Sequence, residues 1–235
     1  MKAVLLAAGL GTRLAPLTYS IPKILVPFCG RPLLERQLEY LARNDVDEVA
    51  VNLHHHADQV RHFLADRELP VAVRTSFESD LLGTAGALIP LRDFLTAPFV
   101  VLYGDVVTDT SLSALLERHR ATRATVTLAF YPSDRTEGKG LLALDSDGRV
   151  TSFQEKPDSR SDTGIVNAGI YAMSPEIFDF IEGPADFGHD VLPAVLGAGK
   201  PIYGYRSTGY VHDIGSLEAL RAAEGELTSR EVGAW

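Results

Sequence analysis

The first residues suited to chemistry form a glycine-rich segment near the N-terminus, AGLGTRL at residues 8–14. Glycines allow the backbone to come close to a phosphate, and backbone N–H groups there can point at its oxygens. Arg13 adds a planar cation that matches phosphate geometry, and Lys23 follows ten residues later, behind Pro22. The pattern is neither the Gly-Lys-Ser/Thr phosphate loop nor the Gly-x-Gly-x-x-Gly dinucleotide motif. The glycines alone are also typical of a tight turn without a ligand, but together with two cations they predict a site for the triphosphate of a nucleotide.

Such a loop needs a strand before it, and the first half of the sequence predicts alternating strands and helices. Short apolar runs typical of buried parallel strands alternate with segments whose apolar residues recur at helical spacing. We expect strands at Lys2–Ala7, Glu48–Leu53, Val71–Thr75 and Phe99–Leu102, and helices from Pro32 to Ala42, at Ala57–Ala65, at Thr84–Leu91 and at Ser111–Thr122, with Ser111 as N-cap. This order predicts a doubly wound α/β sheet with helices on both faces, which binds ligands at the carboxyl ends of its strands.

The second half differs, because its strand-like segments lie close together. Strands are expected at Thr125–Tyr131, Leu141–Leu144, Arg149–Phe153 and Ala168–Met173, and helices at Pro175–Ile181, at Asp190–Leu196 and from Ser216 to about Leu227. Asp147-Gly148 signals a hairpin turn between the middle two strands. The sequence shows no linker, repeat or low-complexity tract, so we expect one domain over residues 1–235.

The run GLGTRLAPLT at residues 9–18, followed by Pro22-Lys23, closely resembles the signature of the sugar-1-phosphate nucleotidyltransferases. Members of that family join a nucleoside triphosphate to a sugar 1-phosphate and release pyrophosphate. The resemblance continues to about Leu227 and implies a Rossmann-like, mixed and mostly parallel sheet with helices on both faces and a small β subregion for the sugar. The nucleotide-binding half would then span about 1–124 and the sugar-phosphate-binding half about 125–227, before a short tail.

The resemblance also implies roles for the charged residues. Arg13 would hold the β- and γ-phosphates and Lys23 the α-phosphate. Asp105, after the apolar run that begins at Phe99, and Asp213, in VHDIG, would be Mg²⁺ ligands, since Mg²⁺ takes one or two carboxylates plus phosphate oxygens. Either aspartate alone is also a common turn or helix-cap residue, so the metal role requires that the fold bring them together. The implied nucleotide-binding residues are Leu6, Ala8, Gly9, Gly11, Thr12, Glu78, Gly83 and Thr84.

A second group of residues is implied to bind the sugar phosphate. Glu155-Lys156-Pro157 resembles a recurrent sugar-site motif, in which the carboxylate accepts hydrogen bonds from sugar hydroxyls and the lysine neutralises the phosphate. An isolated tripeptide of this kind would merely be an exposed turn. Asn167 resembles an asparagine that binds the sugar, and Gly140 resembles a glycine whose backbone faces it, although residues 137–140 are also typical of a flexible loop.

The base is expected at LGTAGA, residues 82–87, where Gly83 permits the close approach of a flat ring. Glu78 stands where uridylyl- and thymidylyltransferases commonly have glutamine. A carboxylate accepts hydrogen bonds but cannot donate them, which suits the N1–H and amino group of guanine. The stretch resembles guanylyltransferases for mannose or heptose 1-phosphate, so GTP and such a sugar are the favoured substrates. Relatives that uridylylate N-acetylmuramate 1-phosphate can also carry an acid nearby.

The remaining candidates have weaker patterns. His54, His55 and His56 are adjacent in one predicted loop, and adjacent residues rarely converge on a single metal ion. We expect Asn52 and one of these histidines to line the nucleotide pocket. Cys29 has no neighbouring base pattern that would make it a nucleophile, so we treat it as structural.

The sequence thus predicts an in-line, Mg²⁺-assisted displacement by the sugar phosphate at the α-phosphorus, with no protein nucleophile. The alternative within the class is UTP- or dTTP-dependent transfer to another sugar or cyclitol 1-phosphate, such as glucose or N-acetylmuramate 1-phosphate. Departures from the family pattern that leave the acceptor open are Ile21, Val211, His212 and Ser216. A glycosyltransferase is disfavoured because DVV at residues 105–107 lacks Asp-x-Asp. A non-catalytic nucleotide-sugar sensor is disfavoured because both cations and both aspartates are present.

Composition bounds the class of protein. The 235 residues include 31 acidic and 22 basic side chains, and the net charge of -9 argues against a nucleic-acid partner. The length suffices for the catalytic core of the family, and we expect no appended β-helix domain. No stretch approaches the roughly 18 apolar residues of a membrane helix, and the N-terminal apolar run is short for a signal segment. We therefore expect a cytoplasmic protein with no membrane partner, for which a homodimer stays open, and the single cysteine excludes an intramolecular disulfide.

Overall fold

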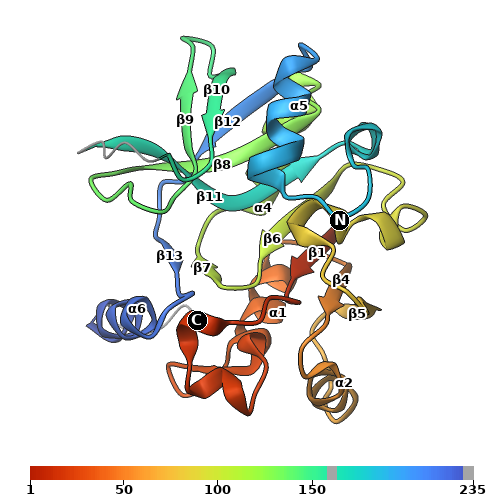
Figure 1. Ribbon diagram of the computed structural model, residues 1–235, viewed down its shortest axis with the longest axis vertical. Coiled ribbons are helices and arrows are strands. Elements are labelled where there is room, and N and C mark those ends of the chain that lie inside the picture. Colours follow the sequence, from red (N-terminus) through yellow and green to blue (C-terminus); the bar gives the residue numbers. More distant parts are fainter. Residues whose placement is uncertain (158–162, 230–235) are drawn as a thin grey trace. The chain divides into compact units, whose positions relative to one another are not determined.

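The computed structural model describes residues 1–157 and 163–229, and these cluster into two compact units (Figure 1). Unit 1 consists of Met1–Leu81, Tyr103–Asp109 and the described residues from Tyr210 onward. Unit 2 consists of Leu82–Leu102 and Thr110–Gly209. The chain therefore passes from one unit to the other several times, and segments distant in sequence build each of them.

Unit 1 contains the parallel strands that the first half of the sequence predicts. Strand β1 (Lys2–Leu6) pairs in parallel with β4 (Glu48–Leu53), which pairs in parallel with β5 (Ala72–Phe77). The interiors of β1 and β4 are buried and are apolar except for Asn52. Helices α1 (Leu33–Arg43) and α2 (Ala57–Ala65) connect these strands in the order expected of parallel crossovers.

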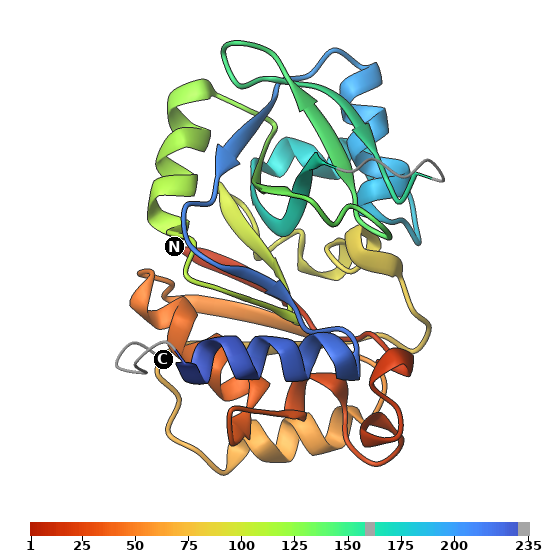
Figure 2. The same cartoon turned by 90° about the vertical axis from the view of Figure 1, so that its left-hand side faces the viewer.

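The rest of unit 1 is built from short elements and from the C-terminal segment. Three 3₁₀ turns and a small hairpin follow β1: η1 (Thr12–Leu14), η2 (Leu17–Tyr19), η3 (Lys23–Leu25), β2 (Pro27–Phe28) and β3 (Arg31–Pro32). Strand β7 (Val106–Thr108) pairs antiparallel with β13 (Val211–Asp213), which leads into α6 (Leu217–Ser229). Helix α6, drawn in blue, accordingly lies beside the red N-terminal segments in Figures 1 and 2. The carboxylate of Glu224, on α6, accepts a 2.7 Å hydrogen bond from the Cys29 N–H.

Unit 2 is organised around the long strand β11 (Gly164–Met173). This strand pairs antiparallel with β6 (Phe99–Tyr103), β8 (Val126–Ser133) and β9 (Leu141–Leu144). The green hairpin of β9 and β10 (Val150–Gln154) is visible in Figure 2, and β12 (Ile202–Arg206) adds a parallel pair to β8. Its helical elements are α3 (Gly83–Gly86), η4 (Ile89–Leu91), α4 (Leu112–Thr122), η5 (Pro175–Phe180), the π-helical turn η6 (Phe187–Val191) and α5 (Leu192–Gly197).

The expected α/β fold with a mixed sheet is confirmed, and several predicted elements agree to the residue. The strands at Glu48–Leu53 and Leu141–Leu144 and the helix at Ala57–Ala65 have the predicted bounds. Ser111 is the N-cap of α4, where its Oγ accepts from the Ala114 N–H at 3.2 Å. In the described residues no helix is long and apolar enough to cross a membrane.

Two kinds of expectation were wrong in detail. The helix predicted at Thr84–Leu91 consists of the short α3 and the separate 3₁₀ turn η4, where Pro90 lacks the N–H that a continuous helix would use. The strands β2, β3, β7, β12 and β13 were not predicted, and all of them except the five-residue β12 have only two or three residues. A pattern of two-residue period needs about four residues before it can be recognised.

Candidate functional site

The glycine-rich loop follows directly from β1. Gly11 adopts a left-handed conformation with φ 64°, and its carbonyl accepts hydrogen bonds of 2.8 Å from Leu14 N and from Thr18 Oγ1. A Cβ at Gly11 would come within 2.8 Å of Thr18 Cγ2 and 3.1 Å of Lys23 Cβ. The loop thus requires a glycine where it packs against the segment that carries Lys23. Two of the other predicted residues bound this loop, because Leu6 ends β1 and Thr12 begins η1. Ala8 is buried, and a Cβ on Gly9 would meet no atom within 4 Å.

Asp105 follows the end of β6 and forms an ion pair with Lys23. The preceding residue, Gly104, donates its N–H to the Leu6 carbonyl at 2.8 Å, and a Cβ there would stand 2.6 Å from that oxygen. Gln37, from α1, is buried and donates to the carbonyl of Val106 at 2.7 Å. These contacts fix the backbone on both sides of Asp105, so the carboxylate is held at the end of β1.

Asp213 reaches the same place through the pairing of β13 with β7. Asp213 stands opposite Val106 in this register, and Ile214 N donates to the Asp105 carbonyl at 2.9 Å. The position of a Cβ on Gly215 would lie 2.8 Å from Asp213 Oδ1, 2.9 Å from Arg13 Nη2 and 3.0 Å from Asp105 Oδ2. The structure therefore brings together an arginine and two aspartates that are far apart from one another in the sequence.

The electrostatics of this group suit a cation. Burial, and then the nearby Asp105 carboxylate, raise the pKa of Asp213, while the Gly215 N–H, Lys23 and Arg13 act in the opposite direction. In the part of the chain that the structure describes, no three His, Cys, Asp or Glu side chains are grouped to hold a metal ion. Two carboxylates with mutual repulsion fit Mg²⁺, which commonly takes only one or two carboxylates and completes its shell with phosphate oxygens and water.

Asn52 connects the start of the loop with Glu78. Its Oδ1 accepts a 2.6 Å hydrogen bond from Ala7 N, and its Nδ2 donates to Glu78 Oε1 at 2.7 Å. The ring of His54 bonds the Glu78 carbonyl through Nδ1 at 2.9 Å. Asn52 and Glu78 are each only 3% exposed. Glu78 is therefore a buried carboxylate in a network at the ends of β1, β4 and β5. Of the three adjacent histidines, it is His54 that joins this network.

In unit 2, the structure brings together all the residues implied to bind the sugar phosphate. Asn167 N donates to the Gly140 carbonyl at 2.9 Å, and a Cβ on Gly140 would stand 2.8 Å from Glu155 Oε2. Lys156 lies beside them, with Nζ 3.5 Å from Glu155 Oε1 and a side chain that is 59% exposed. Asn167 Nδ2 donates to Tyr171 Oη at 2.6 Å, which orients the amide. Sequence reasoning did not identify Tyr171, because its type and spacing are also those of a core residue.

Gly83 and Thr84, expected near the base, lie against the segment 185–187 of unit 2. Gly83 has φ 78°, and a Cβ there would overlap the Ala185 carbonyl oxygen. Thr84 Oγ1 donates to Asp186 Oδ2 at 2.7 Å and accepts from Phe187 N at 2.9 Å. Close packing thus accounts for the glycine, whether or not a base also lies against it.

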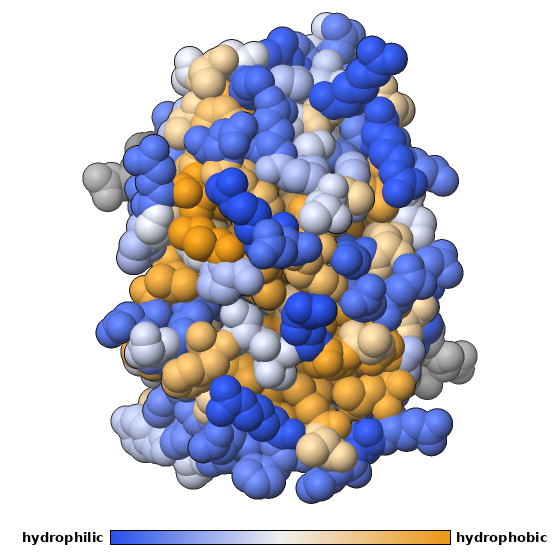
Figure 3. Space-filling model, turned by 90° about the vertical axis from the view of Figure 1, so that its right-hand side faces the viewer, coloured by the Kyte–Doolittle hydropathy of each residue, from blue (hydrophilic) through white to orange (hydrophobic). Residues whose placement is uncertain are grey.

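Several large apolar side chains of unit 1 are exposed. They are Leu10, Leu17, Tyr19, Phe77 and Leu81. Figure 3 shows one face of the molecule, on which apolar side chains gather in patches among charged ones. Leu10 lies between the two loop glycines, and Tyr19 is 77% exposed. Leu10, Leu17 and Tyr19 thus place exposed apolar side chains in the glycine-rich loop and in the turn η2 that follows it.

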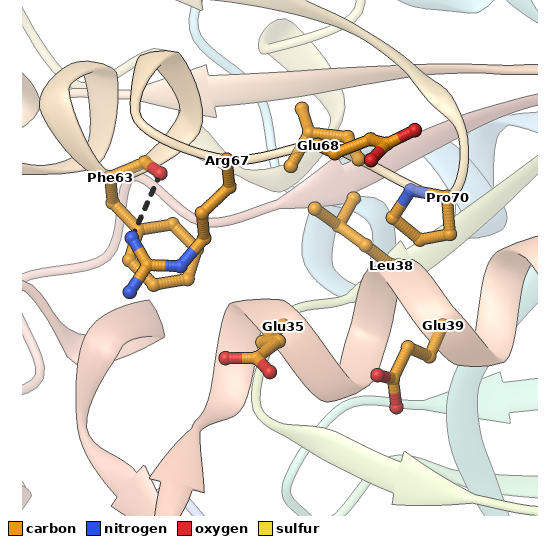
Figure 4. Close-up of a pocket in the computed structure, with 8 residues that line it drawn as sticks. Glu35, Leu38, Glu39, Phe63, Arg67, Glu68 and Pro70 are labelled. Atoms are coloured by element: carbon orange, nitrogen blue, oxygen red, sulfur yellow. Dashed lines mark hydrogen bonds between the residues drawn. The ribbon is translucent and has the colours of Figure 1, made fainter.

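A surface pocket of about 540 Å³ lies elsewhere in unit 1 (Figure 4). Its lining comes from α1, from Phe63 of α2 and from the segment that joins α2 to β5, and includes none of the predicted site residues. The carboxylates of Glu35 and Glu39 both pair with Arg31, and the Arg67 guanidinium lies over the Phe63 ring, 3.9 Å from its centroid. Two of the acidic groups at this pocket are thus paired with an arginine outside its lining, and the arginine in its lining stacks on an aromatic ring.

Comparisons with known proteins identify the family. Residues 2–230 match the family model described as nucleotidyl transferase, and the chain belongs to that family. It is 32% identical, over 99% of its length, to "UTP--glucose-1-phosphate uridylyltransferase" of Synechocystis sp., and 36% identical, over 92% of its length, to "Mannose-1-phosphate guanylyltransferase 1" of Arabidopsis thaliana. The chain covers 64% and 61% of these relatives, which is less than two thirds of either. The resemblance to sugar-1-phosphate nucleotidyltransferases is thereby confirmed.

Solved structures give the same result for the fold. The crystal structure of HddC from Yersinia pseudotuberculosis superposes with a TM-score of 0.81 at 29% identity, covering 96% of this chain and 99% of that one. A second HddC structure is described as complexed with GMP-PN. A Bacillus anthracis protein described as "a Putative Glucose-1-Phosphate Thymidylyltransferase" has a TM-score of 0.88 at 21% identity, which supports the fold alone; it covers 100% of this chain and 97% of that one.

Proposed function

We propose that this chain transfers a nucleotidyl group from a nucleoside triphosphate to a sugar 1-phosphate, giving a nucleotide-sugar and pyrophosphate. The observation that carries this proposal is the convergence of Arg13, Asp105 and Asp213 around Gly215, with Lys23 paired to Asp105. Two cations and two carboxylates at the end of a glycine-rich loop are the groups that phosphoryl and nucleotidyl transfer needs for positioning and charge neutralisation.

The proposed step is one in-line displacement. An oxygen of the sugar 1-phosphate forms a bond to the α-phosphorus, while the bond from that phosphorus to the oxygen bridging the β-phosphate breaks, and pyrophosphate leaves with the electron pair. The attacking oxygen is already ionised, so the chain supplies no nucleophile or base. Arg13 holds the β- and γ-phosphates and Lys23 the α-phosphate, each as a cation that strengthens its contact as charge develops.

Asp105 and Asp213 are the residues that would hold Mg²⁺. When bound, the ion lowers the repulsion between the two negatively charged substrates and polarises the α-phosphate. Gly11 and its neighbours in the loop offer backbone N–H groups to the phosphates. In unit 2, Glu155 and Asn167 bind the sugar hydroxyls and Lys156 balances the sugar phosphate, roles supported by the way these side chains are grouped with Gly140.

GTP and a mannose- or heptose-type 1-phosphate are the favoured substrates. The Arabidopsis relative is a mannose-1-phosphate guanylyltransferase by name, and one HddC structure is described as a complex with GMP-PN. Glu78, an acid rather than an amide, supports guanine through its acceptor-only chemistry, in a position bonded by Asn52. UTP with glucose 1-phosphate is the second candidate, because the Synechocystis relative bears that name over 99% of this chain.

The test is pyrophosphate release by the purified chain over a grid of substrates with Mg²⁺. GTP, UTP, dTTP and ATP are each combined with the 1-phosphates of mannose, a heptose, glucose and N-acetylmuramate. Release with GTP and mannose or heptose 1-phosphate is expected. Release only with UTP or dTTP would overturn the guanine assignment and leave the class intact. No release with any pair, together with tight nucleotide-sugar binding, would replace the enzyme by a sensor.

A further inference from the structure

The carboxylate of Glu155 lies between two glycines from different elements of unit 2. A Cβ on Gly140 would come within 2.8 Å of Glu155 Oε2. A Cβ on Gly188, in the π-helical turn η6, would overlap that same oxygen and stand 2.7 Å from Glu155 Cδ and 2.9 Å from Cγ. All of these distances are shorter than the contacts that real Cβ atoms make. The Glu155 carboxylate therefore occupies the space that a side chain at Gly188 would fill.

The turn that carries Gly188 is held more firmly than the carboxylate. Asp186 caps it, with Oδ1 accepting from Gly188 N at 2.8 Å and from His189 N at 3.3 Å. Thr84 Oγ1 accepts from Phe187 N at 2.9 Å, and the buried Phe187 ring packs on Tyr171 with centroids 5.3 Å apart. Relief of a clash at Gly188 is therefore easier by rotation of the Glu155 side chain than by movement of the turn.

We infer that Gly188 is a positioning residue for sugar 1-phosphate binding: its missing side chain is what lets the Glu155 carboxylate lie beside Gly140 and Asn167. The inference rests on the proposed function, which gives Glu155 its sugar contact. Gly188 has no positive φ, so an alanine there strains no backbone torsion. A single methyl group at this position should displace one functional carboxylate and leave the fold intact.

Steady-state kinetics of Gly188→Ala test this inference. We expect the KM for the sugar 1-phosphate to rise about tenfold or more, the range for loss of a hydrogen bond to a charged group. The KM for the nucleoside triphosphate and the melting temperature should stay near the wild-type values. Gly197→Ala is the matched control, because Gly197 ends the adjoining helix α5 and has no atom within 4 Å of its Cβ position.

A double mutant separates displacement of Glu155 from any other effect of the methyl group. Glu155→Ala removes the carboxylate and the Glu155 atoms nearest to the Gly188 Cβ position, and it should raise the sugar KM on its own. In the Glu155→Ala background the methyl group of Gly188→Ala has no carboxylate left to displace, so the double mutant should bind sugar 1-phosphate no more weakly than Glu155→Ala alone. Fold-changes that multiply would mean that the two residues act independently, and would overturn the inference.

The two proposals fail in different ways. If the wild type turns over and Gly188→Ala has the same KM for the sugar 1-phosphate, the proposed function stands and the role of Gly188 is overturned. Without turnover in the wild type, crystal structures of both forms decide the matter. A displaced Glu155 carboxylate above an unchanged η6 turn supports the inference, and a turn that shifts while the carboxylate stays in place contradicts it.

Discussion

Lys23, in the turn η3, forms an ion pair with Asp105, which follows β6 and Gly104 in the chain. Both side chains are largely buried, at 19% and 15% exposure. In a substrate complex the α-phosphate would take over Lys23 and leave the Asp105 carboxylate to a metal ion. Under the proposed function these two groups would act separately during turnover. The ion pair compensates the charge of a largely buried carboxylate.

Replacement of Lys23 should affect turnover more than binding. In Lys23→Ala, loss of a cation at the α-phosphate is expected to lower kcat by about 10²–10³, the range for removal of one group that stabilises transition-state charge. The KM for the triphosphate should change much less, because Arg13 and the loop N–H groups remain. Initial rates of pyrophosphate release measure both. Lys200→Ala is the control for loss of a lysine ion pair, since Lys200 pairs with Glu176 outside the predicted site, although that pair is more exposed. An unchanged kcat would contradict the role of Lys23.

The two aspartates should control the requirement for Mg²⁺. We expect chelation with EDTA to abolish turnover. Asp213→Asn should raise the Mg²⁺ concentration at half-maximal rate by at least about 10–100-fold, the range for loss of an outer-shell partner of a metal ligand. The amide is nearly isosteric and stays next to the Gly215 N–H, so folding should be retained. Asp109→Asn is the control, an aspartate of the same unit whose Oδ1 accepts from Tyr210 N. Equal Mg²⁺ dependence in both variants would remove Asp213 from the metal site.

Asn52 should act on the nucleotide through the loop. In Asn52→Ala the Glu78 carboxylate loses one hydrogen-bond donor and the Ala7 N–H loses its acceptor on Asn52, and a buried donor left unsatisfied costs about 1–3 kcal/mol. The start of the loop is then less fixed, so the KM for the triphosphate should rise while that for sugar 1-phosphate does not. Asn44→Ala, at the end of α1, is a control for stability alone. If both KM values rise equally, Asn52 supports the fold and not the loop.

The sequence pattern predicted those strands and helices that are determined by their own residues. The strand Glu48–Leu53 contains an apolar run at residues 49–51, and the helix Ala57–Ala65 has apolar residues at helical spacing, so both could be assigned to the residue. Strand β13 could not, because three residues carry no period and its partner β7 lies about a hundred residues earlier in the chain. The pairing of Asp213 with Val106, which places the second aspartate, is therefore a tertiary result.

The same distinction holds for the site. The residue types at Arg13, Lys23, Asp105 and Asp213 predicted the chemistry, and the structure supplies their convergence. The burial of Glu78 and its bond to Asn52 follow from the register of β4 and β5, which the sequence pattern does not contain. Gly188 is a further case, because a glycine in a helical turn has no spacing signal for the carboxylate beside it.

Tyr171 should support sugar binding through Asn167. Its ring is fully buried and its Oη accepts the Asn167 amide N–H at 2.6 Å, while Asn167 Oδ1 accepts from Gly169 N. In Tyr171→Phe the amide loses one of these two restraints, so we expect the KM for sugar 1-phosphate to rise several-fold, with a loss of stability of about 1 kcal/mol. Tyr203→Phe, on β12, is the matched control. A sugar KM equal to that of the control would show that the Tyr171 hydroxyl serves only the core.

His119 should make the stability of the fold depend on pH between about 4 and 6.5. Burial, together with the nearby Arg120, lowers the pKa of His119 from 6.5 to about 4. The imidazole is 1% exposed and bonds Thr127 Oγ1 at 3.1 Å and Ser174 Oγ at 3.0 Å. As the pH falls below 6.5 the unfolded chain takes up a proton that the folded chain does not, so the free energy of unfolding decreases. The full loss, about 3 kcal/mol, is reached near pH 4.

Urea unfolding of the wild type and His119→Gln at pH 7.5 and pH 5 checks this linkage. The wild type should lose about 2 kcal/mol more than the variant between the two pH values, since pH 5 lies about 1.5 units below the unfolded pKa. Carboxylates that titrate in the same range are common to both proteins and cancel in the difference. His189→Gln, at an exposed histidine, should lose as much as the wild type. Equal losses of unfolding free energy in all three proteins would contradict this linkage. They would mean that folded and unfolded His119 take up a proton over the same pH range.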